Sequence, residues 1–257
     1  MGNYLVTGAS GGMGFAIRRA LAREGHGVWG IDRRESEGVI GADITSSADL
    51  QSAFERVRAE AGHLDGIVHA AGVYDLNSLA EMPEADFVRD FDVNLFGMFR
   101  VNQAFLPLLR RGRIVIISSE LAPLHPLTFT GVYAVTKTAV EQYASALRME
   151  LQLLGHKVVV VRPGAVRTDM LPASTGKLDA FCENTRLYPC NAARFKRIVG
   201  RVEARNVAPE KIADVVVRAL KSPRPRLVYC VNRNPMLLAL NALPVRAQLW
   251  IIRKILS

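Results

Sequence analysis

The sequence predicts an α/β fold in which a doubly wound parallel sheet of seven strands carries helices on both faces. Two observations support this prediction. Short runs rich in Val and Ile alternate with amphipathic stretches along the chain, and the apolar runs contain no regular polar positions. Strands of this kind are buried on both faces, as they are in parallel sheets. The alternation with helical patterns implies right-handed crossovers that place helices on both sides of the sheet.

The elements follow one another in a regular order. The expected strands are Tyr4–Thr7, Gly27–Asp32, Val39–Asp43, Gly66–Ala70, Arg113–Ser118, Lys157–Arg162 and Arg226–Val231. The expected helices are Gly14–Arg23, Ala48–Ala61, Ala85–Leu109, Val132–Leu154 and Pro209–Leu220. Residues 171–207 break the alternation as a long, irregular segment rich in Arg and Lys, which is more typical of a substrate lid than of a connector. We expect one domain, residues 1–257, with this lid and an apolar and basic tail at about residues 235–257.

The amino-acid composition excludes several classes of protein. The chain has 257 residues, of which 49% are hydrophobic and 22% are charged, and this excludes a wholly disordered, collagenous or disulfide-stapled chain. The three cysteines cannot all pair and their spacing suggests no metal site, so we expect a reduced, cytoplasmic setting and no metal. The first apolar run begins too early for a signal peptide, and Val6 stands where a myristoylation motif needs Ser or Thr.

The formal net charge of +9 is the unusual feature of the composition. On its own it would indicate a nucleic acid, an anionic membrane surface or an acidic substrate as the partner. The sequence contains no nucleic-acid motif and no platform of interleaved aromatic and basic residues. We therefore expect no nucleic-acid partner.

A glycine-rich turn follows the first apolar run. It reads Thr7-Gly8-Ala9-Ser10-Gly11-Gly12-Met13-Gly14 and opens a helical pattern. Glycines in such a strand–turn–helix unit let the backbone approach a pyrophosphate, whose charge meets the free N–H groups at the helix start. A glycine-rich turn without a ligand is the alternative. The context favours a dinucleotide site and makes the predicted sheet a Rossmann-type sheet.

Asp32 ends the second expected strand, where a carboxylate accepts hydrogen bonds from the adenosine ribose and repels a 2′-phosphate. This position favours NAD over NADP. Arg33 and Arg34 follow directly and would bind a 2′-phosphate instead, because guanidinium pairs well with phosphate. The alternative for these two arginines is a solvated loop. Asp43 would either cap the adenine amino group or begin a helix together with Thr45.

A serine, a tyrosine and a lysine form the candidate catalytic group. Ser119 follows the expected central strand, and Tyr133-Ala134-Val135-Thr136-Lys137 opens a long helix. This spacing places the phenol and the ammonium on one helical face. A nearby cation lowers a phenol pKa from about 10 toward neutrality, so Tyr133 would be a general acid and base while Ser119 holds the substrate oxygen. An isolated tyrosine and lysine would otherwise be a surface pair.

These motifs resemble those of the short-chain dehydrogenase/reductase family from Tyr4 to about Val231. The resemblance also rests on His69-Ala70-Ala71-Gly72, Asn94-Leu95-Phe96-Gly97 and Pro163-Gly164-Ala165-Val166-Arg167-Thr168. It implies that Tyr133 donates or accepts the proton and that Ser119 orients the substrate oxygen. It further implies that Lys137 lowers the Tyr133 pKa and binds the nicotinamide ribose, and that Asn94 helps to hold a water linking Lys137 to bulk solvent.

The resemblance assigns a cofactor site as well. The residues expected there are Gly8, Ser10, Gly12, Met13, Gly14, Asp32, Asp43, Ala70, Ala71, Gly72, Tyr133, Lys137, Pro163, Val166 and Thr168. The last three would meet the nicotinamide. The implied cofactor is NAD, with NADP as the alternative, and hydride would pass between the nicotinamide and the carbinol carbon.

The sequence departs from the family pattern at three places. His69-Ala70 replaces the paired asparagines of single-domain members and resembles the longer sugar-modifying branch, although the chain length matches the single-domain branch. The glycines of the turn fit the spacing of both branches. The gap from Ser119 to Tyr133 is one residue longer than usual, which leaves Ser118 as an alternative partner. We expect His69 to be a core or strand-end residue.

The C-terminal region bears on the substrate and on partners. Residues 226–235 resemble the steroid- and retinoid-directed members, so we expect a lipophilic secondary alcohol or ketone as substrate. The tail would lie on a membrane surface, cover the active site, or pack on its own or a partner subunit. The resemblance implies a homo-oligomer, a dimer or tetramer. The alternative function is an NAD(H)-binding sensor with no turnover, against which the presence of all four catalytic residues argues.

Overall fold

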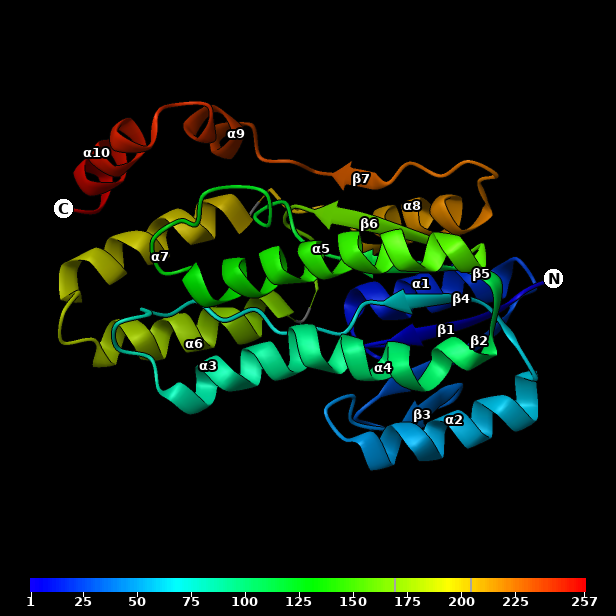
Figure 1. The fold of residues 1–257 in the computed structure, drawn as a ribbon. Coiled ribbons are helices and arrows are strands. Elements are labelled where there is room, and N and C mark those ends of the chain that lie inside the picture. Colours follow the sequence, from blue (N-terminus) through cyan, green and yellow to red (C-terminus); the bar gives the residue numbers. More distant parts are fainter. Residues whose placement is uncertain (169, 204) are drawn as a thin grey trace.

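A seven-stranded parallel sheet forms the centre of the molecule (Figure 1). The computed structural model describes residues 1–168, 170–203 and 205–257, apart from the side chains of 170–175 and 201–203. The strands are β1 (Asn3–Thr7), β2 (Gly27–Asp32), β3 (Val39–Gly41), β4 (Leu64–His69), β5 (Leu109–Ile117), β6 (Lys157–Pro163) and β7 (Val228–Val231). Their order is β3-β2-β1-β4-β5-β6-β7, and every neighbouring pair is parallel. The direction of winding reverses between β1 and β4, so the predicted doubly wound sheet is confirmed.

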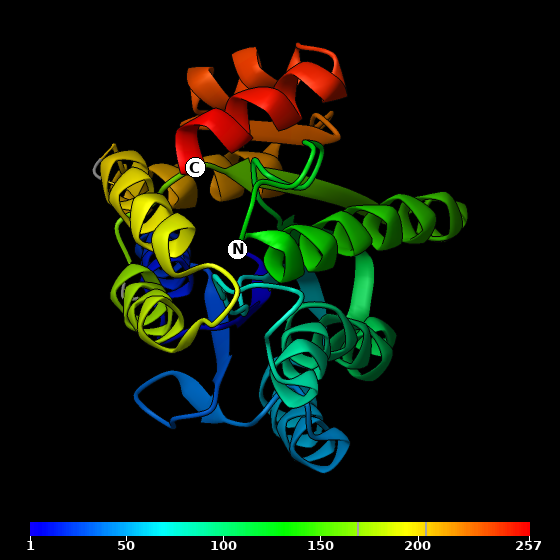
Figure 2. The ribbon, with the colours of Figure 1, turned by 90° about the vertical axis from the view of Figure 1, so that its left-hand side faces the viewer.

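Helices cover both faces of this sheet (Figure 1, Figure 2). They are α1 (Gly12–Arg23), α2 (Ser47–Ala61), α3 (Glu84–Phe91), α4 (Gly97–Phe105), α5 (Gly131–Leu151), α6 (Met170–Asn184), α7 (Pro189–Glu203), α8 (Pro209–Lys221), α9 (Pro235–Asn241) and α10 (Val245–Leu256). Side chains of α2, α4 and α5 pack with Leu5 on one face, and those of α1 and α8 pack with Val6 on the other. Successive strand residues point to opposite faces, which explains why the strands are apolar throughout.

The single helix expected at Ala85–Leu109 is wrong. A π-helical turn at Asp92–Phe96 separates α3 from α4, and a 3₁₀ turn at Leu106–Leu108 leads into β5. Pro107 lies in that 3₁₀ turn, and proline supplies no backbone N–H to continue a helix. The π-helical turn holds Asn94, and such turns occur frequently at functional sites.

The lid region is also more regular than expected. Residues 171–207 form most of α6 and all of α7, which pack against each other. Leu178, Phe181 and Phe195 of these helices are buried around Phe129. Both helices lie beyond the carboxyl ends of the strands (Figure 1), where a lid would lie. The side chains of 171–175 and 201–204 in the expected lid lie outside the described residues.

The C-terminal tail packs on its own subunit, which was one of the expected arrangements. Its α10 contacts α7, and Leu256 joins the cluster around Phe129 (Figure 2). On α10 the side chains of Leu249, Trp250 and Ile255 are exposed. Within the described ranges, we find no helix with the length and apolar character that crossing a bilayer requires.

Candidate active site

The glycine-rich turn lies at the floor of a cleft of about 610 Å³ at the carboxyl ends of β1 and β2. Gly8 has a φ of +64°, and a Cβ built on it would lie 2.7 Å from the backbone nitrogen of Ala71. A Cβ on Gly12 would lie 2.7 Å from the Thr168 methyl carbon. Only glycine fits both places, and the absent side chains leave the backbone open to the cleft.

The start of α1 supplies a site for an anion. Its N-cap residue, Gly11, has no side chain to bond the first turn, and the first N–H groups of a helix have no partner within the helix. Met13 and Gly14 of this turn line the cleft. The cleft therefore fits a pyrophosphate, because unpaired N–H groups and the positive end of the helix dipole both favour negative charge.

Most of the cofactor residues expected from the sequence line this cleft. They are Gly8, Gly12, Met13, Gly14, Asp32, Asp43, Ala70, Ala71, Gly72 and Thr168. Ser10 is near it, since its backbone N–H donates to Asp32 Oδ2 at 3.0 Å. Pro163, Val166 and Tyr133 line a second cavity instead, and Lys137 lines a third.

Asp32 and Asp43 are held in the cleft wall by local hydrogen bonds. Asp32 also accepts from the Arg33 N–H at 2.8 Å, and Arg33 itself lines the cleft. Asp43 Oδ1 accepts from the backbone N–H and the hydroxyl of Thr45, at 2.8 and 2.7 Å. The cap of α2 is Ser46. Asp43 thus forms the turn before this helix and does not itself cap it.

Ser119, Tyr133 and Lys137 meet at the carboxyl end of β5. Hydrogen bonding to Ser119 acts to lower the pKa of the Tyr133 phenol, whereas the Ser118 hydroxyl donates to Glu141 at 2.9 Å. Lys137 Nζ donates to the Ile117 carbonyl at 3.2 Å and lies 5.7 Å from the centre of the Tyr133 ring. The Ser118 hydroxyl is bonded to Glu141, and Ser119 is the serine that acts on the tyrosine.

The expected lowering of the Tyr133 pKa is not found. Burial, with a smaller effect of the Glu120 charge, raises the pKa of Tyr133 to about 12, although the Ser119 hydrogen bond opposes this. Burial also lowers the pKa of Lys137 to about 8. The expectation fails because the burial that disfavours the Tyr133 tyrosinate also disfavours the Lys137 ammonium that was expected to stabilise it.

Asn94 lies beside Lys137 in the wall of a small cavity of about 10 Å³. Its side chain donates to the Val73 carbonyl at 3.1 Å and to the Thr136 hydroxyl at 3.0 Å, and accepts from the Val73 N–H at 2.8 Å. A cavity of that volume holds about one water molecule. The expected water next to Lys137 stays a prediction, and there is room for it.

His69 is a core residue, as expected. It is buried, and its Nε2 lies 2.9 Å from Asn102 Oδ1, while the Asn102 amide donates to the Tyr143 hydroxyl at 3.0 Å. Burial lowers the pKa of His69 to about 4. A neutral imidazole in this network packs β4 against α4 and α5.

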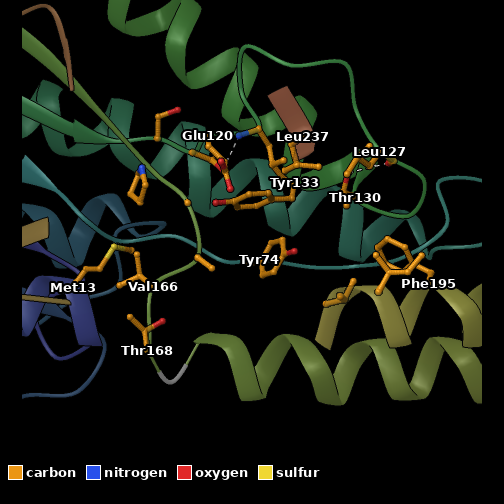
Figure 3. A pocket seen from close by; sticks show the side chains of 18 residues that line it. Met13, Tyr74, Glu120, Leu127, Thr130, Tyr133, Val166, Thr168, Phe195 and Leu237 are labelled. Carbon is orange, nitrogen blue, oxygen red and sulfur yellow. Dashed lines mark hydrogen bonds between the residues drawn. The ribbon is translucent and has the colours of Figure 1, made fainter. Parts of the chain in front are cut away.

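A second cavity, of about 190 Å³, opens in front of Tyr133 (Figure 3). Its wall is largely apolar, with Leu127 from the loop before α5, Phe195 from α7 and Leu237 from α9. Met13 and Thr168 line both this pocket and the cleft. The two spaces therefore meet beside the candidate catalytic group, and we call the smaller one the substrate pocket.

Several residues of the substrate pocket were not expected from the sequence. Tyr74 packs edge-on against Tyr133 with ring centres 4.6 Å apart, and Glu120 lies beside the same ring (Figure 3). Arg89 and Lys177 in the wall of the cleft were missed as well. Only Glu120 could have been found from the sequence, because it directly follows Ser119. The other three residues are brought to the site by the packing of segments far apart in the chain.

The comparisons with known proteins agree with this geometry. Residues 3–178 match the family model described as short chain dehydrogenase. The chain is 28% identical over 229 residues to 3-ketodihydrosphingosine reductase of Bacteroides thetaiotaomicron, covering 86% of this chain and 84% of that protein. It is 33% identical over 196 residues to mouse estradiol 17-beta-dehydrogenase 2, covering 69% of this chain and 50% of that protein.

A solved structure shares the fold. A variant of actinorhodin polyketide ketoreductase with NADPH superposes with a TM-score of 0.74 and 27% identity, covering 90% of this chain and 95% of that one. The parallel sheet, the glycine-rich turn and the group around Tyr133 thus occur in a chain whose sequence matches one family over most of its length. This chain belongs to the short-chain dehydrogenase/reductase family of oxidoreductases.

Proposed function

We propose that the protein is an NAD(P)-dependent oxidoreductase that interconverts a secondary alcohol and a ketone on a lipophilic substrate. The observation that carries this proposal is that Ser119 and Tyr133 line the substrate pocket together, where it joins the cofactor cleft. A bound nicotinamide would supply or accept the hydride. The residues of this chain would orient the substrate and move one proton.

Tyr133 would hold the proton that is exchanged with the substrate oxygen. During reduction the neutral phenol donates to the oxygen that becomes the alcohol, and the raised pKa keeps the phenol protonated until that oxygen acquires charge. Ser119 would hold the same oxygen through its hydroxyl. Lys137 would bind the nicotinamide ribose, and Asn94 would help to hold the water from which Lys137 is reprotonated.

The proposed cofactor is NAD, with NADP as the alternative. The Asp32 carboxylate at the end of β2 supports ribose hydroxyls as its partners, whereas Arg33 in the same wall supports a 2′-phosphate. The ketoreductase structure contains NADPH by its description. Titration with both reduced cofactors, followed by nicotinamide fluorescence, would decide between them.

The apolar wall of the substrate pocket supports a lipophilic substrate. The names of two relatives point the same way, since one is called a reductase of 3-ketodihydrosphingosine and the other a dehydrogenase of estradiol. The test is turnover of sterols, retinoids and long-chain secondary alcohols with NAD or NADP. Activity confined to small polar sugars or acyl thioesters would overturn the lipid part of the proposal.

A single-turnover experiment decides between an enzyme and an NAD(H)-binding sensor. Tight cofactor binding with no hydride transfer to any carbonyl would support a binding protein that has kept the fold and lost the reaction. Hydride transfer that depends on Tyr133 would establish the enzyme.

We also propose that the protein touches membranes peripherally through its C-terminal helices. The exposed side chains of Leu249, Trp250 and Ile255 lie on the same helix as Arg253 and Lys254, and a helix that exposes both apolar and cationic side chains suits an anionic lipid surface. Co-sedimentation with vesicles of mixed neutral and anionic lipid should exceed that with purely neutral vesicles. Equal or absent binding to both would overturn this proposal.

We also propose that the protein is a homo-oligomer and that it is located in the cytoplasm. Exposed Phe96 and Phe99 lie near α5, where Phe99 contacts Tyr143 at 6.5 Å between ring centres, and this face supports contact with a second copy. The three cysteines are free, which supports a reducing compartment. Light scattering should give a mass of two or four chains, and a single-chain mass would refute the oligomer.

A further inference from the structure

One charged side chain projects into an otherwise neutral substrate pocket. Among the described residues that line it, Glu120 is the one with a charge, and the others are apolar or carry hydroxyl groups. Its side chain is enclosed, since the residue is 8% exposed. Figure 3 shows Glu120 beside Tyr133, and the charge of Glu120 contributes to raising the pKa of the phenol.

The two oxygens of Glu120 have different surroundings. Oε2 accepts from the backbone N–H of Asn234 at 2.6 Å, which anchors the start of α9. Oε1 lies against Gly164, where an added Cβ would come within 2.9 Å of it. In the part of the chain that the structure describes, no Lys or Arg lies within 4.0 Å of the Glu120 carboxylate as an ion pair, and the charge of the exposed Arg233 lowers the Glu120 pKa.

The protein offsets the cost of this enclosed carboxylate only in part, through the Asn234 N–H and the charge of Arg233. An enclosed charge is expensive without a paired cation, and burial raises the pKa of Glu120 as expected for such a group. The charge also makes Tyr133 harder to ionise, which opposes alcohol oxidation. A cation bound between the carboxylate and the reacting centre would relieve both effects.

We propose that Glu120 binds an ammonium group of the substrate. On this view, which rests on the oxidoreductase function proposed above, the substrate pair is an amino alcohol and the corresponding amino ketone. The amine lies on a carbon close to the carbinol, so that it reaches Oε1 while the carbinol oxygen is at Ser119 and Tyr133. The rest of the molecule is an apolar chain that lies along Leu127 and Leu237.

The alternative is that Glu120 accepts a hydrogen bond from a neutral substrate hydroxyl, or serves only to anchor Asn234. The substitution Glu120→Gln separates these roles, because the glutamine carbonyl still accepts from the Asn234 N–H while the charge is lost. Glu183→Gln on α6 is the matched control: it removes the same charge from an exposed position near the lid surface.

The first experiment compares the oxidation of 1-aminododecan-2-ol with that of dodecan-2-ol at pH 8, using NAD and NADP. Charge-assisted hydrogen bonds contribute about 1.5–3 kcal/mol, so kcat/KM of the wild type should favour the amino alcohol by about tenfold or more. This preference should fall to about one in Glu120→Gln and persist in Glu183→Gln. Equal preference in the wild type and Glu120→Gln would overturn the proposal.

The second experiment measures binding without turnover, by calorimetry with octylamine and octan-1-ol. The wild type should bind octylammonium about tenfold more tightly or better, and Glu120→Gln should lose the difference. This preference without turnover of 1-aminododecan-2-ol or dodecan-2-ol would sustain the ammonium site and refute the proposed oxidation of lipophilic secondary alcohols. Turnover of dodecan-2-ol, with no preference for 1-aminododecan-2-ol in turnover or for octylamine in binding, would refute the ammonium site alone. If Glu120→Gln fails to fold, the wild-type comparison of the two probes still decides.

Discussion

Replacing Asp90 by asparagine should stabilise the protein at neutral pH. Asp90 on α3 is completely buried, and its Oδ2 is without a hydrogen-bond partner among the described residues. Oδ1 accepts from Arg89 at 3.2 Å, but Arg89 and Lys177 are both already paired with the neighbouring Asp75. Burial and then the Asp75 charge raise the pKa of Asp90 from 3.8 to about 6. A buried carboxylate in which only one oxygen is hydrogen-bonded lowers the free energy of unfolding.

The raised pKa of Asp90 makes the folded protein less stable as the pH rises. The folded state binds the Asp90 proton more tightly than the unfolded state, so stability falls as pH rises from about 4 through about 6. Each pKa unit corresponds to about 1.4 kcal/mol. Because the carboxyl of the unfolded chain is already mostly ionised at pH 4.5, the interval from pH 4.5 to 7.5 spans only part of this change, and we expect a loss of about 1–2 kcal/mol across it.

Urea unfolding of the wild type and Asp90→Asn at these two pH values measures the effect. The free energy of unfolding of Asp90→Asn, relative to the wild type, should be higher at pH 7.5 than at pH 4.5 by about 1–2 kcal/mol. Asp86→Asn is the control, since Asp86 pairs with the same Arg89 from a more exposed position and exposed pairs contribute little. A relative stability of Asp90→Asn that is the same at both pH values would show that the Asp90 charge does not destabilise the folded state.

Three further outcomes are expected. Tyr133→Phe should lower kcat by about 10²–10⁴-fold in a turnover assay while the cofactor dissociation constant stays nearly unchanged; a wild-type rate would exclude the acid and base role. Asp32→Ala should weaken NADH more than NADPH by about tenfold in fluorescence titration, and equal losses would contradict its pairing with the ribose. Phe195→Ala, at a side chain 5% exposed in the cluster around Phe129, should cost about 3–5 kcal/mol in urea unfolding; a cost below about 1 kcal/mol would show that the lid contributes little to the fold.

The sheet and the positions of the motifs could be predicted because they depend on local pattern. Strand ends place Asp32 and Ser119 at one edge of the sheet, and helical spacing joins Tyr133 to Lys137 on one face. The single helix expected at Ala85–Leu109 was wrong because periodicity is insensitive to a π-helical turn, which is set by contacts between Asn94 and segments far along the chain.

The walls of the substrate pocket could not be predicted in the same way. Tyr74, Phe195 and Leu237 come from a loop, a lid helix and the tail, and only the tertiary packing brings them together. The Tyr133 pKa was misjudged for a related reason. The sequence shows a cation four residues away, but the extent of burial around both groups determines which effect is larger.

Phe129 connects the lid to the C-terminus. This residue has a φ of +60° and lies in the loop before α5. Its ring contacts Phe181 of α6, Tyr188 just before α7 and Phe195 of α7, and its cluster includes Leu256 of α10. The roof of the pocket therefore has a small core of its own, separate from the two that hold the sheet. Lid and tail share that core, so the last helix of the chain helps to determine how widely the pocket can open.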